Sequence, residues 1–170
     1  MANVLVEKRG KIGIVTVNRP EQLNSMNSAT RGEMAKAFET MEEDADVSVV
    51  ILTGASGKAF IAGADIKEFS EMILQARDEM EKDWRVTKVI SSMTKPVIAM
   101  IDGFCLGGGL EIAMACDLRI STKKSKLGQP EINIGIIPGA GGTQRLTRLI
   151  GEGRSLELIL TGNMLSLIHI

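Results

Sequence analysis

The stretch Pro96–Ala115, PVIAMIDGFCLGGGLEIAMA, holds the strand, the turn and the helix that decide the fold. Pro96 to Ile101 is a short apolar run of strand length. Three consecutive glycines, Gly107 to Gly109, then lead directly into an apolar run around Glu111 that predicts a short helix. The stretch therefore predicts a strand that is joined to a helix through a glycine-rich turn.

A second apolar run upstream, Val47 to Thr53, predicts another strand. Its continuous Val-Val-Ile-Leu segment, residues 49–52, is typical of a strand that is buried on both faces. Buried strands of this kind favour a layered α/β fold over a half-exposed antiparallel sheet. Strand, loop and helix recur along the chain without a fixed-length repeat, and no linker divides the chain into two domains.

The N-terminal part adds a hairpin and a helix to this plan. Residues 4–8 and 12–17 are two strand-like runs separated by a charged, glycine-containing turn. Apolar residues then recur at helical spacing from Met34 to Met41. We therefore expect a β-hairpin followed by an amphipathic helix.

The remaining helices and loops are predicted from residues that cap helices and from prolines and glycines that interrupt them. Asp65 with Glu68 three residues later has the spacing of a helix N-cap and capping box, and the long helix that follows should end before Pro96. Leu118–Ser121 predicts a further strand. Residues 54–64 are expected to be a glycine-rich loop and residues 123–142 to be irregular, before two closing helices.

Composition excludes several classes of function. Twenty basic and 21 acidic residues leave a net charge of −1, and aromatic residues make up 3% of the 170 residues, so a nucleic-acid partner is not expected. Cys105 and Cys116 lack metal-ligand spacing, and His169 is the single histidine, so neither a zinc site nor a disulfide is expected. The first ten residues resemble neither a signal peptide nor a membrane anchor, which predicts a cytoplasmic protein.

Two glycine-bearing loops could supply catalytic amides. Amides in the first turn of a helix have no partner within it, and the helix dipole favours an anion there. Gly108 occupies such a position, and Glu111 lies one turn further on. The loop that ends at Ala64 could present a second free amide. Two amides directed at one oxygen would form an oxyanion hole.

Five ordered segments between residues 18 and 146 resemble the enoyl-CoA hydratase (crotonase) family. They are Asn18-Arg19-Pro20 with Leu23-Asn24, Ala62-Gly63-Ala64-Asp65-Ile66-Lys67, Gly107-Gly108-Gly109-Leu110-Glu111, Gly128-Gln129-Pro130-Glu131, and the run from Ile137 to Leu146. The resemblance implies a crotonase-like α/β spiral of repeated β-β-α units. It implies a core domain over residues 1–162, an atypical tail over 163–170, and a C-terminal helical region that is largely missing.

The resemblance also implies the site and its reaction, the reversible syn addition of water to a 2-enoyl-CoA thioester. The amides of Ala64 and Gly108 would form the oxyanion hole, and Glu111 and Glu131 would be the two catalytic acids. The implied substrate-binding residues are Ala64, Asp65, Ile66, Lys67, Gly108 and Gly139. The substrate would be an acyl-CoA, with no metal, no further cofactor and no membrane partner, and full-length members would form trimers or hexamers.

Other readings stay open at this point. The three glycines could be only a tight connection, and both glutamates could be solvated surface acids. Asp65 could serve only as a helix cap, and Lys67 could be an exposed helix residue. At the level of function, the alternatives are an enoyl-CoA isomerase and an inactive fragment or binding module that retains the core of the fold.

Overall fold

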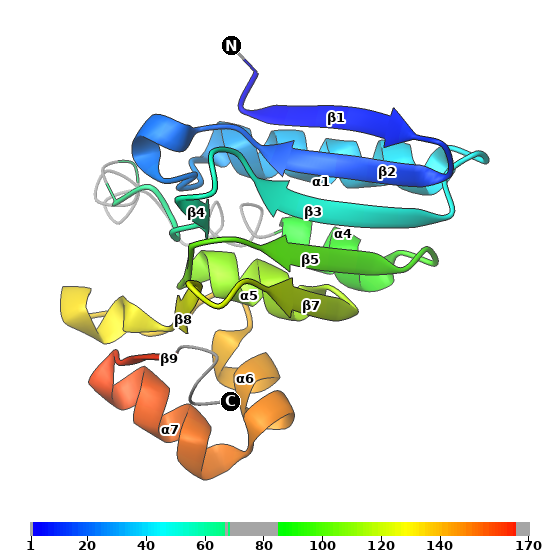
Figure 1. Ribbon diagram of the computed structural model, residues 1–170. Coiled ribbons are helices and arrows are strands. Elements are labelled where there is room, and N and C mark those ends of the chain that lie inside the picture. The colour runs from blue at the N-terminus through cyan, green and yellow to red at the C-terminus, as the bar shows by residue number, and fades with distance from the viewer. Residues whose placement is uncertain (1, 67, 69–84, 166–170) are drawn as a thin grey trace.

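The computed structural model describes residues 2–66, 68 and 85–165, which form two sheets flanked by helices (Figure 1). The larger sheet has the order β1-β2-β3-β5-β7, with strands Val4–Arg9, Ile12–Val17, Val49–Gly54, Val97–Ile101 and Leu118–Ser121. The smaller sheet has the order β4-β6-β8-β9, with strands Ala59–Ile61, Phe104–Leu106, Lys126–Gly128 and Met164–Leu165. The α-helices are α1 (Ser28–Glu43), α4 (Arg85–Ser92), α5 (Gly108–Ala115), α6 (Gly142–Ile150) and α7 (Glu152–Thr161). Two 3-10 helices, η1 (Pro20–Gln22) and η2 (Pro130–Ile134), lie in the connecting segments.

The chain alternates between the two sheets. β5 lies in the large sheet, β6 in the small one, and α5 follows; β7, β8 and α6 repeat that order, with η2 between β8 and α6. β3 and β4 begin an equivalent unit. Neighbouring strands β2, β3, β5 and β7 are parallel, whereas β1 and β2 form the predicted antiparallel hairpin. The expected α/β spiral of β-β-α units is therefore confirmed.

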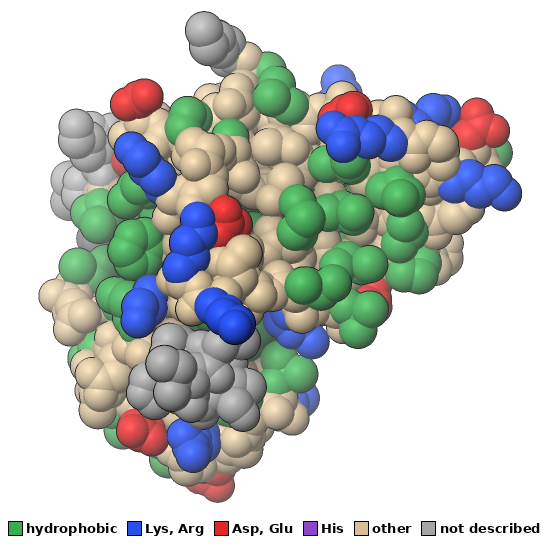
Figure 2. Space-filling model, in the orientation of Figure 1, with side chains coloured by type: hydrophobic (Ala, Val, Ile, Leu, Met, Phe, Trp, Pro, Cys, Tyr) green, Lys and Arg blue, Asp and Glu red, His purple; other side chains and the backbone are tan. Residues whose placement is uncertain are grey.

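The helices α1, α4 and α5 lie against one face of the large sheet (Figure 1). The side chains that point toward them, such as Val50, Leu52 and Ala99, are fully buried. The described helices leave the opposite face uncovered, and Figure 2 shows hydrophobic side chains gathered over its strands. Met100 in β5 and Ile120 in β7 are exposed. The prediction that residues 49–52 are buried on both faces is therefore wrong for one face, because the described helices cover only the other.

The small sheet corrects the reading of three segments as loops. β4, β6 and β8 lie inside segments that were expected to be irregular or a turn. Each is a three-residue strand, which is too short to show either strand or helix periodicity. Glycines next to them, such as Gly57 and Gly103, hide the pattern further. These strands are nevertheless the elements that carry the chain toward the pocket described below.

In the predicted capping box, the Glu68 carboxylate and the Asp65 amide bond to other partners. The amide of Asp65 donates to the Met26 carbonyl oxygen (2.9 Å), and the Glu68 carboxylate accepts from the amide of Ser28 at the start of α1 (2.7 Å). Glu68 thus binds the start of a neighbouring helix instead of its own. The rest of the predicted long helix, residues 67 and 69–84, lies outside the described residues.

The C-terminal part of the described chain joins the small sheet. Met164 and Leu165 pair antiparallel with Gly128 and Leu127. Residues 166–170 of the tail lie outside the described residues. No helix within the described ranges is long and apolar enough to span a bilayer.

Candidate active site

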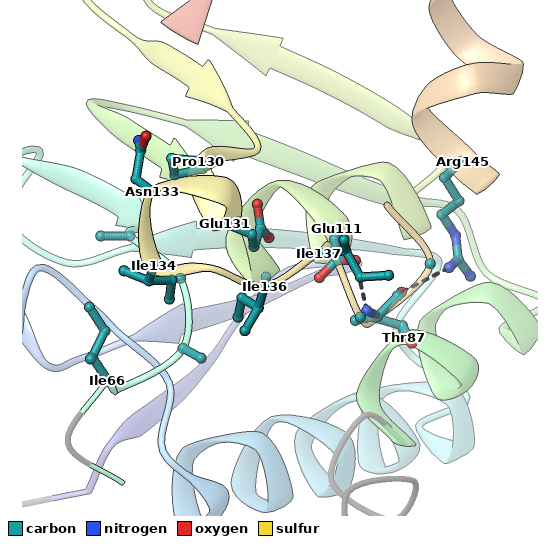
Figure 3. A pocket seen from close by; sticks show the side chains of 18 of the residues that line it. Ile66, Thr87, Glu111, Pro130, Glu131, Asn133, Ile134, Ile136, Ile137 and Arg145 are labelled. Atoms are coloured by element: carbon teal, nitrogen blue, oxygen red, sulfur yellow. Dashed lines mark hydrogen bonds between the residues drawn. The ribbon is translucent and has the colours of Figure 1, made fainter. Parts of the chain in front are cut away.

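A pocket of about 1220 Å³ opens between the two glycine-bearing loops, η2 and the segment before α6 (Figure 3). It brings together most of the residues that the sequence proposed for the site. The proposed residues that line it are Ala64, Ile66, Gly108, Glu111, Glu131 and Gly139. Part of its wall is apolar, since Ile134, Ile136 and Ile137 also line it.

The first amide comes from the start of α5. Gly107 precedes the helix with φ +52° and ψ −126°, a conformation that favours glycine, and its own amide donates to the Gly128 carbonyl oxygen (2.9 Å). Gly108 is the first helical residue and lines the pocket. Within the described part of the chain, no hydrogen bond is recorded for its amide, so this N–H is available to a ligand.

The second amide comes from the loop that follows β4. Ala64 forms an isolated parallel bridge with Met26: the Met26 amide donates to the Gly63 oxygen and the Asp65 amide donates to the Met26 oxygen, both over 2.9 Å. In such a bridge the amide of the central residue, here Ala64, points away from its partner strand. Ala64 lines the pocket, and among the described residues its amide has no recorded acceptor.

Close backbone contact holds the two amide-bearing segments together. A Cβ added to Gly109 would lie 2.1 Å from the carbonyl oxygen of Ile61, and one added to Gly63 would lie 3.4 Å from that of Leu106. Glycine at these positions lets the backbone that carries Ala64 approach the start of α5. The free amides of Ala64 and Gly108 thus stand on adjoining walls of one pocket.

Glu111 is anchored by main-chain donors. Its side chain is buried, with 1% of the residue exposed, and Oε1 accepts hydrogen bonds from the amides of Ala140 and Gly142, each over 2.7 Å. Burial raises the pKa of this carboxyl, while the two amides and the charge of Arg145 oppose that rise. Because these donors favour the ionised form, Glu111 is suited to be the proton acceptor of the pair.

Glu131 has the complementary environment. It is half-buried in η2, and its carboxyl faces the glycine turn so closely that a Cβ on Gly107 would lie 3.0 Å from Oε1. Burial, with the nearby charge of Glu111 as a smaller cause, raises the pKa of Glu131 to about 7. Near neutral pH a substantial fraction of this carboxyl is therefore protonated and able to donate a proton. Figure 3 shows both glutamates in the same pocket.

Two further residues hold the acids in place, and the sequence assigned a role to neither. Gln129 is fully buried; with its amide nitrogen turned toward the acid, it donates to Glu131 Oε1 (3.0 Å) and to the Gly107 oxygen (3.2 Å). Arg145 donates to the Ala140 oxygen (3.3 Å), so it supports the loop that binds Glu111. Both lie within the quoted motif segments, but their contacts join distant parts of the chain.

One predicted substrate-binding residue stands apart from the pocket wall, and a second cannot be placed relative to it. Asp65 is not among the lining residues, and its carboxylate pairs with Arg19 (3.0 Å). Lys67 lies outside the described residues. The others, including Ile66 and Gly139, are where a ligand could contact them.

The fold and the site together define an α/β protein whose β-β-α spiral brings two free amides and two carboxyl groups to one pocket. The chain belongs to the enoyl-CoA hydratase/isomerase family, whose model matches residues 7–167.

Named relatives agree with this assignment. The chain is 49% identical over 160 residues to a short-chain-enoyl-CoA hydratase of Clostridium acetobutylicum. The matched residues make up 94% of this chain and 61% of that protein. It is 41% identical to a crotonyl-CoA hydratase of Syntrophomonas wolfei, over 96% of this chain and 64% of the relative. Among solved structures, the enoyl-CoA hydratase of Bacillus anthracis superposes with a TM-score of 0.89 at 40% identity, over 98% of this chain and 66% of that one. The chain thus spans about three fifths of the length of these curated relatives.

Proposed function

We propose that this chain carries the catalytic centre of an enoyl-CoA hydratase, which adds water reversibly and in syn fashion to a 2-enoyl-CoA to give a 3-hydroxyacyl-CoA. The observation that supports this most is the presence of two carboxyl groups, Glu111 and Glu131, in the pocket that also presents the free amides of Ala64 and Gly108. The names of the relatives favour the same reaction.

The amides would act on the thioester carbonyl. Two N–H donors at its oxygen stabilise the negative charge that develops there when water adds, and this draws electron density from the β-carbon. One donor of this kind is typically worth about 2.7–4 kcal/mol of the barrier. The amides of Ala64 and Gly108 need no rearrangement to serve, because the backbone around each is already held by hydrogen bonds and close packing.

The two acids would divide the proton transfers. Glu111, held by two amide donors, would take a proton from water as the oxygen attacks the β-carbon. Glu131, whose pKa is raised to about 7 mainly by burial, would protonate the α-carbon when it is in its neutral form. After hydration Glu111 holds the proton taken from water and Glu131 has lost its own, so the starting state returns when Glu111 releases a proton and Glu131 takes one up, directly or through solvent. Water is added as H and OH with no net oxidation or reduction, so the scheme needs no redox group.

The function is tested by assaying the chain with crotonyl-CoA while its mass is measured by size-exclusion chromatography. We expect loss of the conjugated thioester absorbance and formation of 3-hydroxybutyryl-CoA. Conversion of 3-enoyl-CoA to 2-enoyl-CoA without hydration would favour the isomerase instead. A folded monomer that binds crotonyl-CoA without turnover would favour a binding module.

The pH dependence of kcat/KM follows from the two environments. Glu111 must be ionised, so the rate should fall at acidic pH as its raised pKa is crossed. Glu131 must be protonated, so the rate should also fall as pH rises through about 7. The resulting pH profile is bell-shaped. Since the two carboxyls interact, its two apparent pKa values belong to the pair and not to either residue alone. A rate that climbs steadily from pH 7 to about pH 9 would contradict this assignment.

A further inference from the structure

An ion pair lies directly behind the loop that carries the Ala64 amide. Arg19 Nη2 is 3.0 Å from Asp65 Oδ2, with 14% and 19% of the two side chains exposed. Arg19 Nη1 donates to the carbonyl oxygen of Ser25. Neither charged residue lines the pocket. The guanidinium therefore joins the residue next to Ala64 to the segment that precedes Met26.

That preceding segment serves as the neighbouring strand of the loop. The amide of Ala62 donates to the Leu23 oxygen (3.2 Å), and Met26 exchanges two hydrogen bonds with Gly63 and Asp65. These bonds use the backbone groups on both sides of Ala64 and leave its own N–H directed away from Met26. The direction of the Ala64 N–H thus depends on where residues 23–26 are held.

A buried amide fixes the shape of that segment. Asn24 is fully buried; its Oδ1 accepts from the Arg19 amide (2.9 Å), and its Nδ2 donates to the oxygen of Ala59 in β4 (2.7 Å). Leu23 and Asn24 both have left-handed backbone angles, with φ of +51° and +57°. Arg19 is therefore fixed at its backbone by Asn24, while its side chain reaches across to Asp65.

We propose that Arg19 and Asp65 are positioning residues that aim the Ala64 N–H at the acyl oxygen. The inference rests on the proposed function, since it assigns these residues to the oxyanion hole of that site. Because the pair touches the loop and not the pocket, its loss should weaken polarisation of the bound carbonyl much more than it weakens thioester binding. A displacement of about 1 Å in such a donor is enough to cost on the order of 10²-fold in rate.

The test compares Arg19→Met, Asp65→Asn and the double variant with the parent chain. We expect kcat for crotonyl-CoA to fall about 10- to 100-fold in each, with KM changed by less than about threefold. The double variant should be no worse than the poorer single one, because both remove the same interaction. Arg19→Lys should restore part of kcat by restoring one charged donor.

A spectroscopic readout separates positioning from general structural damage. Cinnamoyl-CoA absorbs at longer wavelength when its carbonyl is polarised, so the parent chain should shift its band and the variants should shift it less. Lys8→Met serves as a matched control, because it removes an exposed ion pair with Asp44 (3.0 Å) on another part of the molecule. Thermal unfolding checks that each variant is folded, and Asp65→Asn keeps the size of the side chain if Arg19→Met is unstable.

The possible results separate failure of the positioning role from failure of the proposed hydratase function. An active parent chain whose band shift and kcat are unchanged in the folded variants overturns the positioning role alone. Equal losses in kcat and in affinity, with an unchanged band shift, overturn it as well. A parent chain that neither hydrates crotonyl-CoA nor shifts the cinnamoyl band overturns the proposed function and the inference together.

Discussion

Replacement of Glu131 by glutamine is expected to lower the turnover of enoyl-CoA hydration by about 10²- to 10⁴-fold, the usual contribution of a positioned acid. The amide has nearly the same shape as the carboxyl group but holds no proton that it can deliver to the α-carbon. The hydrogen-bonding environment, with Gln129 within 3.0 Å of Glu131 Oε1, can accommodate an amide oxygen. Binding of the thioester should therefore change little. Steady-state hydration and a direct measurement of thioester binding check both parts.

The matched control for this variant is Glu157→Gln on the exposed surface of α7. It makes the same chemical change at a distance from the described pocket lining, so its turnover should equal that of the parent chain. Turnover of Glu131→Gln within a factor of about three of the parent rate would remove Glu131 from the mechanism.

Gly109→Ala is expected to destabilise the fold by about 1–3 kcal/mol or more, the usual range for overpacking, and to open the oxyanion hole. The new Cβ would lie 2.1 Å from the Ile61 oxygen and 2.9 Å from the Ile61 Cβ. The nearest atom belongs to the backbone, so relief requires the strand β4 or the helix α5 to move. Either movement separates the loop of Ala64 from Gly108. Urea unfolding measures the loss of stability, and the hydration rate measures the loss of alignment.

Gly153→Ala provides the control, because Gly153 also lies in a helix but a Cβ there would meet no atom within 4 Å. Alanine is the better helix former by up to about 1 kcal/mol, so this variant should equal or exceed the parent in stability. If Gly109→Ala were as stable and as active as Gly153→Ala, close contact between the two loops would not be what aligns the amides.

The elements that the sequence predicted well are those with a regular apolar pattern of at least four residues. The hairpin of residues 4–17, the helix α1 and the strand β7 all lie where periodicity or an apolar run placed them. In the hairpin and α1, side chains such as Val15 and Phe38 pack into the buried core, whereas β7 leaves its apolar side chains, Leu118 and Ile120, exposed. The local apolar pattern was therefore sufficient to predict where most strands of the large sheet lie.

The small sheet and the open face of the large sheet were not predictable in the same way. Three residues carry no usable period, so β4, β6 and β8 depend on pairing with segments far along the chain. The side chains of β3 alternate between buried and half-exposed although all are apolar in residues 49–52. Apolar character alone does not say whether a covering layer exists on that side.

The site likewise contains residues that the sequence predicted and residues to which it assigned no role. The motifs predicted Ala64, Gly108, Glu111 and Glu131 from residue type and local turns, and the fold brings all four to one pocket. They included Arg19 but assigned it no role, because its side chain pairs with a residue 46 positions away. Such contacts have no local signature, so they become visible only once the loops are placed side by side.

The most direct test of the account is a crystal structure of the chain with butyryl-CoA, which cannot accept water because it lacks the double bond. We expect its thioester oxygen to lie about 2.7–3.1 Å from both the Ala64 nitrogen and the Gly108 nitrogen. The carboxyl groups of Glu111 and Glu131 should then face the α- and β-carbons of the acyl chain. A thioester bound with its oxygen turned away from either nitrogen, or with the two glutamates on opposite sides of its acyl chain, would contradict the account.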